Sequence, residues 1–188
     1  MYRMKRREVV DDRSQEYTSY IITHVSNVIR SWEDILRPAI MEHLDELSDV
    51  IDTKGISRVD SIIKSHDSSK WQSDEWFAYL DHWYPEKGQP DNDDAYDLAW
   101  LHHQQNNGHH WQHWILIRDS GNTYPLDMPI EYICEMICDW HSFSAKADNN
   151  TAKEWYEMHG DDMILSRNTR MKLEQLLEFA DTPLTQLD

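Results

Sequence analysis

Residues 57–71, SRVDSIIKSHDSSKW, end an apolar stripe of helical spacing on a histidine–aspartate pair. The spacing predicts a short helix from Ser57 to Ser65, and one face of this helix is apolar through Val59, Ile62 and Ile63. His66 continues this inward face, and Asp67 follows where the helix should end. An imidazole and a carboxylate placed together at the inner end of a helix indicate both a helical fold and a site.

Helical spacing recurs on both sides of this stretch and predicts an all-α, single-domain bundle of about seven helices, residues 1–188. Before the stretch, we expect helices at 16–36 and 38–52. After it, we expect helices at 73–83, 94–106 and 109–117, and one that starts at 127–129 and carries Asp139. Two further amphipathic stretches close the chain, at 152–159 and 168–180.

The expected helix ends coincide with residues that break helices. Pro38 opens the second helix, and Gly55 separates it from the next. A loop is expected at 85–94, PEKGQPDNDD, a break at 106–108, NNG, and a turn at 119–122, DSGN. No segment is a convincing strand.

The chain has 188 residues, which suggests one domain with a sizeable core rather than two. The basic segment 1–15 lacks the apolar region of a secretory signal, and we expect it to be flexible. No apolar run of about 18 residues occurs, which argues against a membrane span. Cys134 and Cys138 lie four apart on one predicted helix, where the geometry disfavours a disulfide, so a reduced, cytoplasmic setting is expected.

The net charge is −17, from 35 acidic and 18 basic residues. This excess argues against duplex nucleic acid as a partner, because duplex binding depends on lysine and arginine contacts to phosphate. A small phosphorylated substrate stays compatible with the charge, since a bound metal ion can reverse the field locally. The sequence leaves a homo-oligomer open.

Two further polar residues lie on inward faces of other predicted helices. His24 shares its face with Tyr17, Tyr20, Ile21 and Val28, and Asp139 shares its face with Tyr132, Met136 and Phe143. With His66 and Asp67 they make two imidazoles and two carboxylates, a ligand set for a divalent cation such as Mn, Fe, Co, Ni or Zn. Such a cation gives hydrolytic chemistry a hydroxide nucleophile near neutral pH.

Each of these residues also has a simpler interpretation. An inward histidine is more often a hydrogen-bonded core residue than a metal ligand, and Asp139 could pair with a lysine or arginine. An unpaired buried carboxylate is costly, however, and a cation held with two imidazoles would pair with it. Three inward polar sites on three separate helices, all of metal-ligand type, favour the metal site.

More imidazoles lie in LHHQQNNGHHWQHW, residues 101–114, where a helix break separates two adjacent histidine pairs. The break could bring one histidine of each pair to a common point. The candidates are His102 or His103 with His109 or His110, and helical neighbours do not distinguish between them. Two more imidazoles would allow a second metal ion near the first, as in two-metal hydrolysis. The alternative is a histidine-rich tract with incidental metal affinity.

The order His24, His66-Asp67, Asp139 resembles that of the HD-domain superfamily, whose members are all-helical, metal-dependent phosphohydrolases. The string HDSSK at 66–70 resembles the HD-x-[GS]-K variant of two-metal members. The strings HHQQNNGHHW and EMICDW resemble those of a small bacterial and phage branch. The resemblance covers about residues 16–145.

The resemblance implies roles for the motif residues. The first metal ion would be bound by His24, His66, Asp67 and Asp139. Asp67 would bridge to a second ion, held by His103 and His110 or by their neighbours His102 and His109. Lys70 would contact phosphate or stabilise the charge of the transition state, although a solvated lysine is an equal alternative.

Two glutamates are candidate site residues from their sequence positions alone, and the resemblance assigns no role to either. Glu75 could be a general base or an outer group that orients a ligand, and its position in the first turn of a helix explains it equally well. Glu135, one turn before Asp139, could orient that carboxylate or a bound water.

The predicted function is therefore a metal-dependent phosphohydrolase with one or two metal ions, acting on a small phosphorylated metabolite, with a nucleotide as the expected substrate. Trp71, Trp76 and Trp111 follow closely on candidate ligands and could stack on a base, although such residues are more often core. One alternative is a di-iron oxygenase, because some HD-fold proteins with six His/Asp ligands and an HD-x-[GS]-K string resemble such enzymes. Another is a non-enzymatic acidic helical interaction protein with a closed structural metal site.

Overall fold

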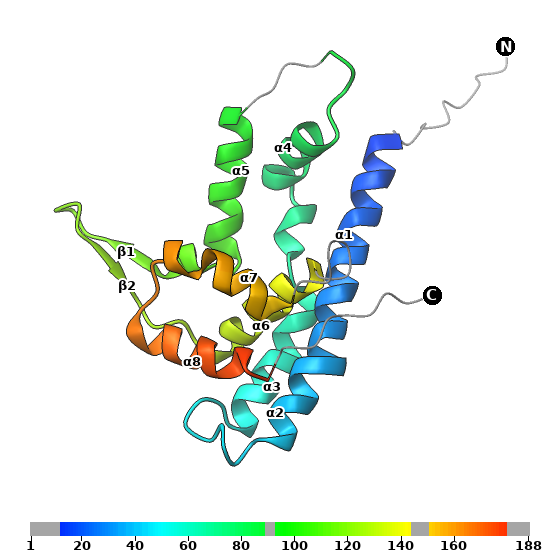
Figure 1. Ribbon diagram of the computed structural model, residues 1–188. Helices are drawn as coiled ribbons and strands as arrows, with labels where there is room; N and C mark the ends of the chain where they lie inside the picture. The colour runs from blue at the N-terminus through cyan, green and yellow to red at the C-terminus, as the bar shows by residue number, and fades with distance from the viewer. Residues whose placement is uncertain (1–11, 89–92, 144–150, 180–188) are drawn as a thin grey trace, which may run out of the picture.

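The computed structural model describes residues 12–88, 93–143 and 151–179, and in these ranges the chain forms a helical bundle with one small β-hairpin (Figure 1). The predicted predominantly α fold class is confirmed. Most of the predicted N-terminal segment 1–15 lies outside the described residues, but residues 12–15 already belong to the first helix.

Helix α6 (Ile130–Ser142) lies at the centre of the bundle, and most of its residues are buried. It packs against helices from both ends of the chain, namely α1 (Asp12–Arg30), α3 (Thr53–Ile62), α7 (Ala152–His159) and α8 (Arg167–Leu177). A helix that is apolar on nearly all sides has to be surrounded in this way. Glu135 and Asp139 interrupt the apolar character of α6, and both belong to the candidate site.

The first two predicted helices are joined into one continuous helical segment. α1 passes through a π-helical turn, Ser31–Leu36, into α2 (Arg37–Glu42). The prediction of a helix end before Pro38 is wrong, because Pro38 lies in the first turn of α2, where its missing N–H is tolerated. The wider turn before it is closed by Arg37 N–H, which donates to the carbonyl of Trp32.

The predicted helix 38–52 is too long, and Gly55 does not separate it from the next helix. α2 ends at Glu42 and α3 begins at Thr53, so Gly55 lies in the first turn of α3. Asp52 caps this helix by accepting the Gly55 N–H at 2.7 Å. A Cβ at Gly55 would come within 2.8 Å of the Ile51 side chain and 3.3 Å of Ile130, so the glycine allows α3 and α6 to pack closely.

Helices α4 (Ser73–Trp83) and α5 (Asp93–Asn106) stand side by side and agree with their predicted ranges (Figure 1). They form a second apolar cluster against the N-terminal half of α1, made of Tyr17, Ile21, Tyr79, Leu80 and Ala99. The main core lies around α6. The candidate site lies where these two clusters meet, so it is bordered by packed helices on several sides.

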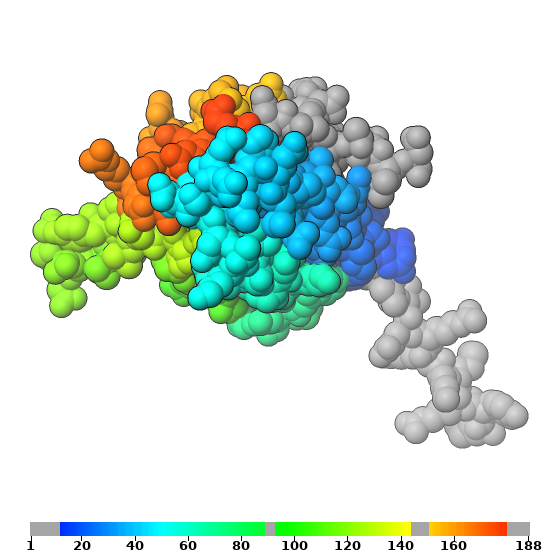
Figure 2. Space-filling view, turned by 90° about the horizontal axis from the view of Figure 1, so that it is seen from below, coloured from blue at the N-terminus to red at the C-terminus, as the bar shows by residue number. Residues whose placement is uncertain are grey.

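The predicted helix 109–117 is wrong. Its residues form a 3-10 turn, Trp111–Trp114, followed by strand β1 (Ile115–Ile117), which pairs antiparallel with β2 (Thr123–Pro125). Three β-branched or aliphatic residues in a row do not distinguish a strand from a helical segment. The hairpin protrudes from the body (Figure 2), and Ile117 near its tip is 67% exposed. Gly121, with φ of +81°, provides the turn predicted at 119–122.

The two C-terminal amphipathic stretches are helices α7 and α8, as predicted. Thr151 and Glu154 form a capping box at the start of α7, and Ser166 caps α8 by accepting the Thr169 N–H. Within the described ranges, no helix is both long enough and apolar enough to cross a membrane.

Candidate metal centre

The His66-Asp67 pair sits at a sharp change of backbone direction. α3 continues as a 3-10 turn to Ser65, which confirms the predicted helix end, and Asp67 then adopts left-handed backbone angles, φ 56° and ψ 22°. Among the described residues it is the one non-glycine residue with positive φ. Such a conformation is costly and persists where the surrounding structure imposes it. Here it turns two consecutive side chains towards the same point in the interior.

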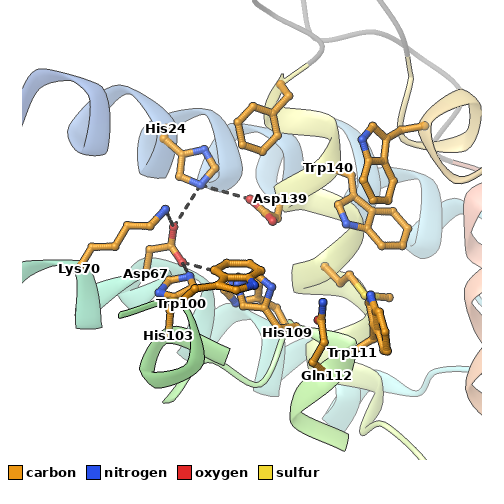
Figure 3. A pocket seen from close by; sticks show the side chains of 14 residues that line it. His24, Asp67, Lys70, Trp100, His103, His109, Trp111, Gln112, Asp139 and Trp140 are labelled. Atoms are coloured by element: carbon orange, nitrogen blue, oxygen red, sulfur yellow. Dashed lines mark ion pairs between the residues drawn. The ribbon is translucent and has the colours of Figure 1, made fainter. Parts of the chain in front are cut away.

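The Nε2 atoms of His24 and His66 lie 3.2 Å apart and face the same two carboxylates. His24 Nε2 lies 3.2 Å from both Asp67 Oδ2 and Asp139 Oδ1 (Figure 3). His66 Nε2 lies 3.5 Å from the same two oxygens. Donor atoms bound about 2.0–2.2 Å from one cation lie roughly 2.8–3.6 Å from their neighbours. The separations between these four residues, 3.2–3.5 Å, all fall in this interval, so the residues have the spacing of a metal site.

The proton positions on the two imidazoles follow from their outer neighbours. His66 Nδ1 lies 2.9 Å from Glu135 Oε1, and a carboxylate only accepts, so His66 Nδ1 carries a proton. Ser142 Oγ donates its one hydrogen to the carbonyl of Asp139 at 2.7 Å, so it accepts from His24 Nδ1 at 3.0 Å. In their neutral forms, both histidines therefore present Nε2 lone pairs to the carboxylates. Acceptors that face one another in this way need a cation between them.

A second cluster lies against the other oxygen of Asp67. His103 Nε2 lies 3.2 Å and His109 Nε2 3.6 Å from Asp67 Oδ1, and His110 belongs to the same group, whose ligand atoms all lie within 4.8 Å of one another. His103 Nδ1 donates to Glu75 Oε2 at 2.7 Å, which leaves its Nε2 lone pair facing Asp67. The Asp67 carboxylate thus stands between two groups of donors, one on each oxygen.

Two buried atoms of the second cluster, Asp67 Oδ1 and His110 Nε2, have no hydrogen-bond partner among the described residues. Leaving a buried polar atom unpaired costs about 1–3 kcal/mol, so native structures rarely do so without a reason. One cation would interact favourably with both atoms. The donor set, the spacing and the unpaired atoms together fit a divalent metal ion.

When no metal ion is bound, protons on the imidazoles supply part of the positive charge that the buried carboxylates need. Burial disfavours the charged imidazole of His66, but the negative charge of Asp67 and the hydrogen bonds to Asp139 and Glu135 outweigh it and raise the pKa of His66 to about 10. The pKa of Asp67 stays well below its usual value, because the charges of His66 and Lys70 outweigh its burial. Metal binding would therefore displace protons from the site.

The second cluster contains one imidazole that resists protonation. Burial, reinforced by the neighbouring His109 and His103, holds the pKa of His110 well below its usual value. For His103, burial is outweighed by the nearby carboxylates of Asp67 and Glu75, and its pKa is raised. A neutral imidazole is the form that binds a metal ion, so His110 is ready to act as a ligand.

The structure distinguishes between the members of the histidine pairs. His103 points into the second cluster, whereas His102 lies outside it, 29% exposed, with Nδ1 2.8 Å from Glu75 Oε1. The spacing therefore does not support His102 as a ligand. His109 and His110 both belong to the cluster. The sequence predicts one histidine from each pair, and the structure instead groups three, His103, His109 and His110, beside Asp67.

Glu75 and Glu135 lie on the Nδ1 side of the imidazoles, opposite the Nε2 atoms that face Asp67. Glu75 is fully buried and accepts from His103 and His102. Glu135 Oε1 accepts from His66 at 2.9 Å and lies 3.4 Å from His109 Nδ1, so it contacts one histidine from each cluster. A general base has to reach the substrate, which neither carboxylate does here. The arrangement favours the other predicted role, that of orienting ligands.

Lys70 lies beside the first cluster, with Nζ 2.6 Å from Asp67 Oδ2 and the side chain 15% exposed. Burial would lower its pKa, but the charge of Asp67 outweighs burial and raises it, so the ammonium stays charged. The solvated-lysine alternative therefore does not fit.

A cavity of about 360 Å³ opens beside both clusters. Its polar end holds the candidate ligands and Lys70, with Trp100 stacked on His103 and Phe143 packed on His24. Trp111, Gln112 and Trp140 lie at the other end (Figure 3). Of the three tryptophans singled out in the sequence, Trp111 lines this cavity, whereas Trp71 and Trp76 stack on each other elsewhere, 5.5 Å between ring centres.

Several residues of the site carry no signal in the sequence. Ser142 behind His24 and the cavity residues Trp140, Trp155 and Gln112 could not be assigned from spacing, because serines, tryptophans and glutamines occur at many unrelated positions. The sequence offers two hints, both by adjacency: EMICDW contains Trp140 next to Asp139, and the histidine-rich stretch 101–114 contains Gln112.

Glu135→Gln is expected to weaken metal binding at both positions by about 10–100-fold, because one carboxylate orients a histidine of each cluster. The amide keeps the size of the side chain but loses its charge. Titration of metal-free protein with Mn²⁺ or Co²⁺ in a calorimeter measures the change. Glu131→Gln, one turn earlier on α6 at an ion pair with Arg58, is the matched control. Equal affinities in the two variants would contradict the role of Glu135.

Metal-free protein is expected to lose stability as the pH rises from 6.5 towards about 10, the ordinary and folded pKa values of His66. A raised folded pKa contributes stability that is complete below the ordinary value and is lost as the pH rises through the folded value. Thermal unfolding in EDTA at pH values of about 6, 8 and 10 tests this. His66→Gln should show a flatter profile; parallel profiles would refute the expectation.

A family model described as a family of unknown function, DUF5662, matches residues 13–179. No curated protein and no solved structure matches the chain. The family description names neither an activity nor an HD domain, so the resemblance drawn from the motifs stays a prediction.

Proposed function

The chain belongs to the DUF5662 family, and we propose that this member is a metal-dependent phosphohydrolase acting on a small phosphorylated metabolite, in particular a nucleotide. The observation that carries the proposal is the Asp67 carboxylate, which stands between two groups of donors whose lone pairs face it. A bound divalent cation supplies Lewis-acid chemistry, since it lowers the pKa of a coordinated water and offsets charge on a phosphoryl group.

The donor set divides into two parts around Asp67. His24, His66 and Asp139 share Oδ2 and would hold one cation, while the group of His103, His109 and His110 shares Oδ1 and would hold a second. Imidazole suits Zn, Fe, Co and Ni, and carboxylate suits Mn, so the two parts together are compatible with several of these metals. The resemblance to two-metal HD-domain proteins agrees with this division.

Lys70 is proposed to position the phosphoryl group. Its ammonium lines the cavity next to Asp67 and keeps its proton. A fixed positive charge beside the reacting group stabilises the negative charge that develops in phosphoryl transfer. Glu75 and Glu135 hold the imidazoles in place from behind, so that the lone pairs stay aimed inward.

The cavity supports an enzyme rather than a structural metal site. A structural site is closed by its protein ligands, whereas a catalytic site keeps a position open to substrate. Here the cavity reaches both clusters and is large enough to take a small ligand.

The setting proposed for this activity is cytoplasmic, with a small molecule as partner rather than duplex nucleic acid or membrane. Cys134 and Cys138 are buried and free in α6, and the net charge is −17. Both facts support the proposal, since free thiols suit a reducing compartment and an acidic surface repels nucleic acid.

Elemental analysis of tag-free protein, followed by a phosphate-release screen with Mn²⁺, Co²⁺ or Ni²⁺, tests the function. We expect bound divalent metal and release of phosphate from at least one class of phosphomonoester. Tightly retained iron with oxygen consumption would indicate the di-iron oxygenase instead. A protein that binds none of these metals on reconstitution would overturn the proposal and leave a helical interaction protein.

A further inference from the structure

One buried polar group in the cavity is not accounted for by metal ions. Gln112 lines the cavity, and its Oε1 is buried without a hydrogen-bond partner in the described part of the chain. Asp67 Oδ1 and His110 Nε2 are unpaired in the same cavity, but both belong to the donor cluster. An amide oxygen kept unpaired in the interior is destabilising, because a buried acceptor loses its hydrogen bonds to water. A ligand that pairs with the amide would explain it.

Gln112 lies at the aromatic end of the cavity, next to Trp111 and away from Lys70 (Figure 3). Trp140 and Trp155 stack on each other at this end, 4.6 Å between ring centres and 30° between planes. Tryptophan faces attract flat rings by offset stacking and tolerate many ring types. The aromatic end therefore suits a planar group, and the amide suits the hydrogen-bonding edge of that group.

The opposite end suits one compact anion. Among the described residues that line the cavity, Lys70 is the one lysine or arginine. The cavity of about 360 Å³ is at the small end of ligand pockets, so its volume favours a single phosphate over a chain of several phosphates. The two ends together describe a molecule with a single anionic group and a flat, hydrogen-bonding ring.

We propose that Gln112, with Trp111, Trp140 and Trp155, forms a subsite for a planar heteroaromatic ring, and that the substrate is a monophosphate ester of the nucleoside type. The inference rests on the proposed phosphohydrolase function and specifies its substrate. The ring stacks against the tryptophans, and a ring N–H or amino group donates to the Gln112 amide oxygen. Gln112 is a specificity-determining residue that does not touch the reacting phosphorus.

Nucleosides test the subsite without any reaction, because they carry the ring but no phosphate. Binding of adenosine, guanosine, cytidine and uridine to metal-loaded protein is measured by calorimetry, with ribose as the ring-free comparison. We expect at least one nucleoside to bind and Gln112→Leu to weaken that binding about tenfold, the effect of one lost hydrogen bond. Gln105→Leu makes the same change at an exposed position of α5 and should bind as the wild type does.

Hydrolysis provides the second measurement. Gln112→Leu should raise the KM of the matching nucleoside monophosphate about tenfold with kcat nearly unchanged, and should leave ribose 5-phosphate turnover as it is. Failure of every nucleoside to bind, or equal binding by wild type and Gln112→Leu, overturns the subsite. Nucleoside binding that depends on Gln112, without phosphate release from any monophosphate, supports the subsite and refutes the phosphohydrolase.

Discussion

Asp67→Asn is expected to remove both metal ions at once and to lower phosphate release by about 10³-fold or more. The reason is geometric. Oδ2 of Asp67 faces His24 and His66, and Oδ1 faces His103 and His109, so one substitution changes both donor groups. The amide has no negative charge and offers only one acceptor atom. Elemental analysis and phosphate release, measured on the same preparation, test both parts.

Asparagine is the appropriate replacement because of the backbone at this position. Asp67 has left-handed angles, which asparagine adopts more readily than alanine, so the fold should persist. Asp94→Asn, at an exposed position of α5, controls for the loss of one carboxylate elsewhere. A variant that kept one full equivalent of metal would show that Asp67 serves only one ion and would refute the bridging arrangement.

Lys70→Met is expected to separate metal binding from catalysis. The ammonium lies 2.6 Å from Asp67 Oδ2, so it repels a cation at the same oxygen. Its removal should leave metal affinity unchanged or tighter, while phosphate release falls by about 10²–10³-fold through the loss of a charge that stabilises the transition state. Calorimetric metal titration and steady-state kinetics measure the two effects.

Lys64→Met, at an exposed position just before the HD pair, is the matched control and should leave both quantities as in the wild type. Loss of metal from Lys70→Met would mean that the lysine holds Asp67 in place and has a structural role. Unchanged phosphate release would mean that the phosphoryl group binds elsewhere in the cavity.

The sequence predicts most of the helices and most of the candidate ligands, because both depend on local spacing. His24, His66 and Asp139 lie on apolar faces, and the structure brings these three residues and Asp67 together. The helix ends at 106 and near 83 coincide with clear break signals. In these places local and tertiary preferences agree, and such agreement is what makes a pattern predictive.

Other features depend on contacts that spacing does not encode. His103 rather than His102 points into the cluster because of the way α5 packs against Glu75. A glycine is required at position 55 by the close approach of α6, and not by a helix break. The short apolar run 115–117 fits a helix or a strand equally well, and only its pairing with 123–125 decides. The residues of the proposed Gln112 subsite come from α6, α7 and a 3-10 turn, which no local pattern links.

The candidate ligands come from segments far apart in the chain, and the hydrogen bond between His24 and Ser142, which lies three residues after Asp139, joins residues 118 positions apart. A cation shared by His24 and Asp139 would act as a cross-link between the N-terminal and central helices. In the chain-entropy account, closing a loop of about 100 residues in this way lowers the freedom of the unfolded chain by about 4.7 kcal/mol. Release of the ion would then become a step in unfolding, so that the lifetime of the folded state follows the rate at which metal dissociates.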